Sequence, residues 1–149
     1  MEFNIPRSLK TEHEELHSKL VEASRAGGRT GDTAKAVAEV LRPHFEKEEG
    51  YALPPLGLLP LLADGNITQD MANVIPMTER LKAEYPQMLR DHKLIAAALR
   101  NLFDVAIKDQ LPAYAHLAET LMLHAQTEEE VLYPASILIG EYLKLRLKR

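Results

Sequence analysis

Two stretches of the chain carry the same pattern of histidine and carboxylate residues, which are the side chains that bind metal ions through nitrogen and oxygen. The repeated residues are Glu12-His13 and His44-x-x-x-Glu48-Glu49 in the first half, and Asp91-His92 and His124-x-x-x-Glu128-Glu129 in the second. The intervals nearly match, because the two histidines are 31 residues apart in the first half and 32 apart in the second. The repeat therefore predicts a metal site to which both halves contribute.

The second histidine and the glutamate of each half are four residues apart, so both lie on one face of a helix, one turn apart. Four histidines and two carboxylates exceed what one tetrahedral zinc ion needs. They suit two metal ions that are bridged by both carboxylates, each ion taking two imidazoles. A bridging oxide or hydroxide would complete the centre and leave a coordination position open. The predicted ligands are His13, His44, Glu48, His92, His124 and Glu128.

The ligand types also predict which metal binds. Nitrogen and oxygen donors in this mixture favour two iron ions, with manganese or zinc as substitutes. The chain has no cysteine, which excludes thiolate zinc sites, iron–sulfur clusters, disulfides and thiol nucleophiles.

The elements that carry these residues are predicted to be helical, because apolar residues recur with helical periodicity and no convincing alternating stretch appears. The first helix is expected to end at Gly27-Gly28, where the chain needs a left-handed residue. The long third helix is expected to kink near Pro76 and near Pro86. The predicted helices span residues 8–26, 32–49, 69–108, 113–130 and 134–149.

Two helical hairpins side by side give the predicted fold class, an all-α antiparallel up-down four-helix bundle in one domain over residues 1–149. The midpoint between His13 and His44 and the midpoint between His92 and His124 both fall beside predicted turns. Residues equidistant from a hairpin turn lie at the same height, so we expect four imidazoles at one level. The apolar, proline-rich connection 51–68 is expected to cover one end of the bundle. Its leucines, Leu58 or Leu59, could offer a surface to a second copy of the chain, giving a homo-oligomer.

The pattern resembles the hemerythrin-like, or HHE cation-binding, family over residues 12–134, including the ending Glu128-Glu129-Glu130-Val131-Leu132-Tyr133-Pro134. The resemblance implies that the six predicted ligands hold a di-iron centre. It also implies binding or sensing of O2 or NO, or iron handling. The oxygen-carrying members have a fifth histidine where this chain has Ala96, and an aspartate where it has Glu129. His17, four residues after His13, could supply the missing ligand.

Other residues near the pattern are predicted to play lesser roles. Glu49 and Glu129 are expected to accept hydrogen bonds from the metal ligands or to be solvated. Either could instead be the bridge, in place of Glu48 or Glu128 respectively. Tyr51 and Tyr133 are expected to pack at the bundle end rather than to donate hydrogen bonds near the metals. His116 is expected on the surface.

Two enzymes are the alternative hypotheses. His13-Glu14-Glu15-Leu16-His17 matches the H-E-x-x-H motif of zinc metalloproteases, but a zinc hydrolase would leave the second half unexplained. A ferritin-like di-iron oxidase, or related peroxidase-like chemistry, needs Glu-x-x-His on two helices, and Glu14-x-x-His17 is the one instance here. The histidine-rich set therefore favours binding or sensing over catalysis.

Composition limits which binding partners and which cellular location are expected for the protein. The 149 residues carry a formal net charge of −4, which makes nucleic acid a poor candidate partner. The start of the chain lacks the features of a secretory signal, so a cytoplasmic protein is expected. The most apolar run, residues 51–63, is too short to span a membrane and contains three prolines.

Overall fold

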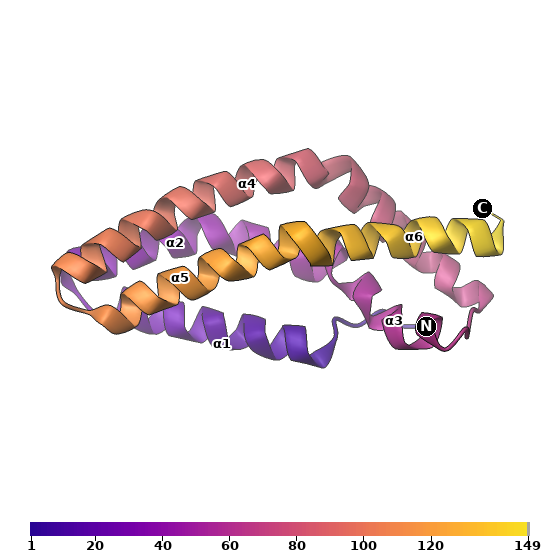
Figure 1. Ribbon diagram of the computed structural model, residues 1–149, viewed down its shortest axis with the longest axis horizontal. Helices are drawn as coiled ribbons and strands as arrows, with labels where there is room; N and C mark the ends of the chain where they lie inside the picture. The colour runs from indigo at the N-terminus through magenta and orange to yellow at the C-terminus, as the bar shows by residue number, and fades with distance from the viewer. Residues whose placement is uncertain (149) are drawn as a thin grey trace.

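Four long helices pack along one another in the computed structural model, which describes residues 1–148 (Figure 1). These helices are α1 (Arg7–Ser24), α2 (Gly28–Lys47), α4 (Ile75–Lys108) and α5 (Pro112–Thr127). Helix α1 packs on α2, α2 on α4, α4 on α5, and α5 on α1, so the four helices enclose a common interior. No strand occurs between residues 1 and 148. The predicted all-α helical bundle is therefore confirmed.

Short turns join the helices of each half, and both turns lie at the same end of the molecule (Figure 1). Residues 25–27 join α1 to α2, and Gly27 and Gly28 have φ angles of 76° and 58°, as the left-handed conformation predicted for this site requires. The two turns contact each other through Asp109, whose Oδ1 lies 2.6 Å from Arg29 Nη2 and whose Oδ2 accepts a hydrogen bond of 2.9 Å from Thr30 Oγ1. The halves are thus tied together at this end.

The connection between α2 and α4 is a series of short helical segments. It comprises the π-helical turn η1 (Glu48–Ala52), the 3-10 segment η2 (Pro54–Leu58), α3 (Leu59–Ala63) and the 3-10 segment η3 (Gln69–Val74). Leu53, Leu56 and Leu58 are buried against Ile139 and Leu143 of α6 (Tyr133–Leu147). The connection therefore covers one end of the bundle, as expected. The expectation that Leu58 offers an exposed surface is wrong because this side chain lies in the core, whereas Leu59 is 44% exposed.

The kink predicted near Pro76 is wrong, and so is the predicted start of this helix at residue 69, because α4 begins at Ile75. Pro76 lies in the first turn of α4, where the missing N–H has no helical partner to lose, so it begins the helix instead of kinking it. Pro86 lies inside α4, and the helix bends along its length (Figure 1). Helix α6 continues the line of α5 through the π-helical turn η4 (Glu128–Leu132) and ends at Leu147; Arg149, placed in this helix by the sequence, lies outside the described residues.

Each long helix buries one stripe of side chains and exposes polar faces. In α1 the buried residues are His13, Leu16, Leu20 and Ala23, at the three- and four-residue spacing of one helix face. The apolar members of these stripes fill the bundle between the turns and the histidines. None of the helices between residues 1 and 148 is long and apolar enough to cross a membrane.

Candidate metal centre

Four histidines, one from each long helix, meet in the interior of the bundle. His13, His44, His92 and His124 lie on the buried stripes of α1, α2, α4 and α5, and none is more than 7% exposed. They form two pairs, with 3.0 Å between the Nε2 atoms of His13 and His124 and 2.8 Å between those of His44 and His92. Each pair therefore takes one histidine from each half of the sequence.

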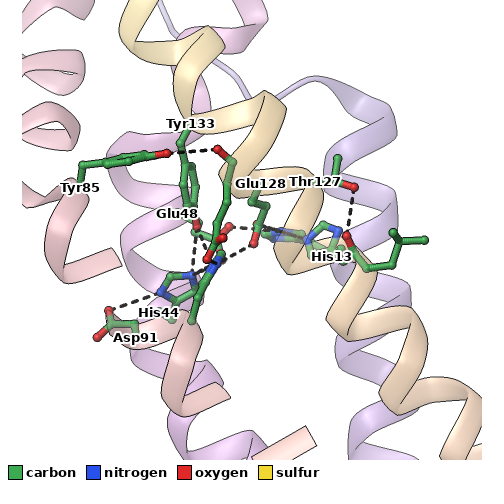
Figure 2. A network of polar contacts seen from close by, with 12 residues as sticks. His13, His44, Glu48, Tyr85, Asp91, Thr127, Glu128 and Tyr133 are labelled. Carbon is green, nitrogen blue, oxygen red and sulfur yellow. Dashed lines mark hydrogen bonds and ion pairs between the residues drawn. The ribbon is translucent and has the colours of Figure 1, made fainter. Parts of the chain in front are cut away.

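Two buried glutamates lie between the histidine pairs (Figure 2). Glu48 Oε1 is 3.3 Å from His44 Nε2, and its Oε2 is 3.9 Å from His13 Nε2. Glu128 Oε1 is 3.4 Å from His92 Nε2, and its Oε2 is 3.2 Å from His124 Nε2 and 3.5 Å from His13 Nε2. Both carboxylates thus reach across the two pairs. In the described part of the chain, two groups could hold a metal ion: His13, His124 and Glu128, and His44, His92 and Glu128.

The buried carboxylate oxygens offer a direct test of whether a cation fits. Both oxygens of Glu48, and Oε2 of Glu128, have no hydrogen-bond partner among residues 1–148. A buried carboxylate that is neither paired nor hydrogen-bonded costs several kcal/mol if it is ionised, and burial accordingly raises the pKa of Glu128 to about 7. A cation between the oxygens and the Nε2 atoms would offset that cost. The residues present therefore fit a metal ion.

A second set of carboxylates faces the outer nitrogen, Nδ1, of the histidines. His92 Nδ1 is 2.9 Å from Glu129 Oε1, His44 Nδ1 is 3.5 Å from Asp91 Oδ2, His124 Nδ1 contacts Glu12 Oε1, and His13 Nδ1 is 3.9 Å from Glu49 Oε1. A carboxylate holds the imidazole proton on the nitrogen that faces it. The lone pair of each Nε2 is thereby directed inward, toward Glu48 and Glu128.

The outer carboxylates follow the sequence repeat. Glu12, which precedes His13 in the first half, contacts His124 of the second half. Asp91, which precedes His92 in the second half, contacts His44 of the first half. Glu49, which follows Glu48, faces His13 of the same half, and Glu129, which follows Glu128, faces His92 of the same half. Glu12 and Asp91 received no role from sequence reasoning, although their equivalent positions in the repeat were a signal that could have identified them.

Burial favours the neutral form of three of these histidines, His44, His92 and His124. Desolvation lowers the pKa of His44 to about 4, with a further contribution from His92. Desolvation is also the largest cause of the lowered pKa of His92 and of His124, and it outweighs the opposing carboxylates. A metal binds neutral imidazole, so these histidines are ready to act as ligands without losing a proton.

Glu48 and Glu128 each begin a π-helical turn. Glu48 opens η1 and Glu128 opens η4, so the two halves repeat this backbone irregularity as well as the ligands. Single π-helical turns within longer helices are frequent at functional sites, and they change the face on which the following residues lie. The side chains after each glutamate therefore lie where a regular helix would not place them.

Tyr133, which follows the second π-helical turn, brings its hydroxyl into the site (Figure 2). Its oxygen is 3.0 Å from His44 Nε2 and 3.2 Å from His92 Nε2, and its side chain is fully buried. Burial, followed by the charge of Glu128, raises the pKa of this phenol well above its usual range. Tyr133 thus packs in an apolar cluster, but the expectation that it makes no hydrogen bond near the predicted ligands is wrong. Tyr51 also packs, beneath the guanidinium of Arg80.

Three histidine or glutamate positions that the sequence raised are not brought into the centre. His17 and Glu14 are exposed on α1, and His17 lies beside Phe45, with 6.4 Å between the ring centroids. His17 belongs to neither of the ligand groups found over residues 1–148, so the structure does not assemble the zinc-protease arrangement there. His116 is exposed on α5, as expected.

A pocket of about 250 Å³ opens beside His13. Its walls come from α1, α2 and the start of η1, and include His13, His17, Arg42, Phe45 and Glu49. The pocket is therefore next to His13, and His124 does not line it. His44 and His92 do not line it.

No family model, curated protein or solved structure matches the chain. The interpretation of the centre therefore rests on its own geometry.

Proposed function

We propose that the protein binds two metal ions between its four long helices, one at each histidine pair, with Glu48 and Glu128 bridging them. The observation that carries this proposal is the spacing of the Nε2 atoms, 2.8 Å and 3.0 Å within the two pairs. Two donors at right angles, each about 2.1 Å from one ion, lie about 3 Å apart. Without an ion, two inward lone pairs at this distance repel each other. A bound cation turns the repulsion into two coordinate bonds.

The proposed architecture is a single-domain, antiparallel up-down bundle of the hemerythrin-like type over residues 1–149. Two features support it: the cyclic packing of α1, α2, α4 and α5, and the two short turns at one end of the molecule (Figure 1). The long connection between α2 and α4 crosses the opposite end, and α6 extends beyond the bundle. A site built from inward side chains on four facing helices is typical of such bundles.

Iron is the proposed physiological metal, and a small diatomic molecule, O2 or NO, is the proposed ligand, in a binding, sensing or iron-handling role. The donor set is imidazole nitrogen with carboxylate oxygen, which suits iron and leaves manganese or zinc as substitutes. Two imidazoles and one oxygen from each bridging glutamate are fewer donors than the six of an octahedral ion. An ion held by this set has room for a small external ligand.

Metal analysis of the reconstituted protein tests the proposal. Metal-free protein is loaded anaerobically with ferrous iron, freed of excess iron and assayed, with two irons per chain expected. Glu48→Ala and Glu128→Ala should each reduce the bound iron to one ion or fewer, because each removes a bridge.

Each half has a matched control, a glutamate two residues from the substituted one. Glu46 and Glu130 are exposed, so Glu46→Ala and Glu130→Ala should still bind two irons. Unchanged iron content in both bridge variants would show that the bridges are misassigned, and a parent protein without bound metal would overturn the proposal. Optical titration of the reduced, loaded protein with NO and with O2 then tests the diatomic ligand.

A further inference from the structure

We propose that Tyr133 is an oxygen ligand of the metal ion held by His44 and His92, so that the two ions have unequal coordination. This inference rests on the proposed function, since it adds a protein ligand to one of the two proposed ions. The tyrosine hydroxyl was expected to lie away from the metals, and the structure places it against both histidines.

The geometry supports coordination at a single ion. The three atoms His44 Nε2, His92 Nε2 and Tyr133 Oη form a triangle with sides of 2.8, 3.0 and 3.2 Å. Three donors on one face of an octahedron lie about 3 Å from each other when each is about 2.1 Å from the ion. The oxygens of Glu48 and Glu128 lie at 3.3 Å and 3.4 Å from the same nitrogens, so they can complete further positions around that ion.

Hydrogen bonds alone cannot satisfy both histidine nitrogens and the tyrosine oxygen. Asp91 and Glu129 face the Nδ1 atoms of His44 and His92, so both Nε2 atoms carry inward lone pairs. The phenol has one proton to donate and can satisfy one of the two nitrogens at a time. The other nitrogen would keep an unpaired, buried lone pair beside its neighbour. An ion bound by all three atoms removes this defect.

The sequence repeat shows that the tyrosine is specific to one ion. Tyr133 lies five residues after Glu128, and the residue five after Glu48 is Leu53. Leu53 is buried in an apolar cluster and offers no ligand. Within residues 1–148 the hydrogen bonds of His13 and His124 involve no hydroxyl group. The ion at His13 and His124 would therefore have one protein ligand fewer than the ion at His44 and His92.

Coordination changes the phenol in a way that spectroscopy detects. The O–H bond breaks, an oxygen–metal bond forms, and the proton leaves to solvent, with no electron transferred. A phenolate bound to ferric iron absorbs visible light by ligand-to-metal charge transfer. A phenolate bound to zinc shows the ultraviolet difference spectrum of an ionised tyrosine. The two metals thus give independent readouts that do not depend on biological activity.

The test compares Tyr133→Phe with two controls, Tyr51→Phe and Tyr85→Phe. Tyr51 packs in the same apolar cluster as Tyr133, and Tyr85 lies beside it, with 6.1 Å between the ring centroids. The parent and both controls should show the charge-transfer band when loaded with iron and oxidised in air. They should also show one ionised tyrosine per chain when titrated with zinc. Tyr133→Phe should lose both signals completely while retaining two bound metal ions.

The outcomes separate the two proposals. Two metal ions per chain without either signal in the parent would overturn the tyrosine ligand and leave the metal centre standing, as would signals that persist in Tyr133→Phe. A parent that binds no metal would overturn the proposed function and the inference with it. If Tyr133→Phe does not fold, the parent and the two controls still decide the matter, because a missing signal in the parent overturns the ligand.

Discussion

The two nitrogens of each histidine in the centre have different tasks. Nε2 faces the buried glutamates Glu48 and Glu128, while Nδ1 faces an outer carboxylate that fixes the proton and the orientation of the ring. The outer contacts are unequal, with 2.9 Å for His92 and Glu129 but 3.9 Å for His13 and Glu49. Glu49 also has 55% of its side chain exposed, so its influence on His13 is weakened by solvent. The ring of His13 is therefore the least firmly oriented of the four.

Asp91→Asn tests the outer carboxylates. The substitution removes the charge that faces His44 Nδ1 but preserves the shape of the side chain. Loss of such a partner typically weakens metal binding by about 10- to 100-fold. We therefore expect weaker binding in competition with a chelator, still with two ions per chain at saturation.

Asp104→Asn is the matched control, because Asp104 is exposed on the same helix. It should bind metal as tightly as the parent. Equal affinity in both variants would show that Asp91 does not support its histidine.

Helical spacing predicted that Glu48 and Glu128 share a helix face with the histidines, because this relation is local in the chain. Four residues separate His44 from Glu48 on a regular helix, which brings both to one face. Glu48 and Glu128 are accordingly buried, while Glu49 and Glu129 have side chains 55% and 36% exposed. Tyr133 was beyond such reasoning because a π-helical turn separates it from Glu128 and changes the face that it occupies.

The contact between α4 and α6 depends on a glycine. A Cβ added at Gly140 would lie 1.9 Å from Thr78 Oγ1, and Thr78 is itself buried. Gly140→Ala should therefore lower the free energy of unfolding by about 1–3 kcal/mol through overpacking, as measured by urea denaturation.

Gly50→Ala provides the comparison, because no atom lies within 4 Å of the Cβ that it would add. Its effect should stay within about 0.5 kcal/mol. A similar loss of stability in both variants would argue that α4 and α6 do not require a close approach at Gly140.

The metal ions are expected to stabilise the whole molecule, since each binds residues from both halves of the chain. Removing them with a chelator leaves buried carboxylate oxygens without partners, so the Tm should fall. A ligand at 100 times its Kd contributes about 2.7 kcal/mol. For a chain of this size, that corresponds to a decrease on the order of 5–10 °C, measured by thermal denaturation.

Glu128→Ala serves as the control for the chelator itself. This variant lacks the glutamate shared by the two ligand groups and is expected to bind at most one ion, so chelation should lower its Tm less than that of the parent. A parent protein whose Tm is insensitive to the chelator would contradict a stabilising role for the ions.

Sequence spacing predicted the level of the histidines but not their partners. The midpoints of the histidine intervals fall near the turns at residues 25–27 and 109–111, which is why the four imidazoles meet at one height. Spacing along a hairpin gives height and does not give the order of helices around the bundle. That order depends on how the halves pack, and it pairs His13 with His124 and His44 with His92.

The pairing of histidines across the halves has a consequence for folding kinetics. The paired histidines are 111 and 48 residues apart along the chain, so neither half alone holds a complete pair. Bringing such distant residues together requires the long loops to close first. A complete histidine pair forms only when the two halves dock, so we expect each ion to bind after that step. Interactions formed after the transition state slow unfolding and leave the folding rate almost unchanged. We therefore expect bound ions to slow the unfolding of the bundle more than they speed its folding.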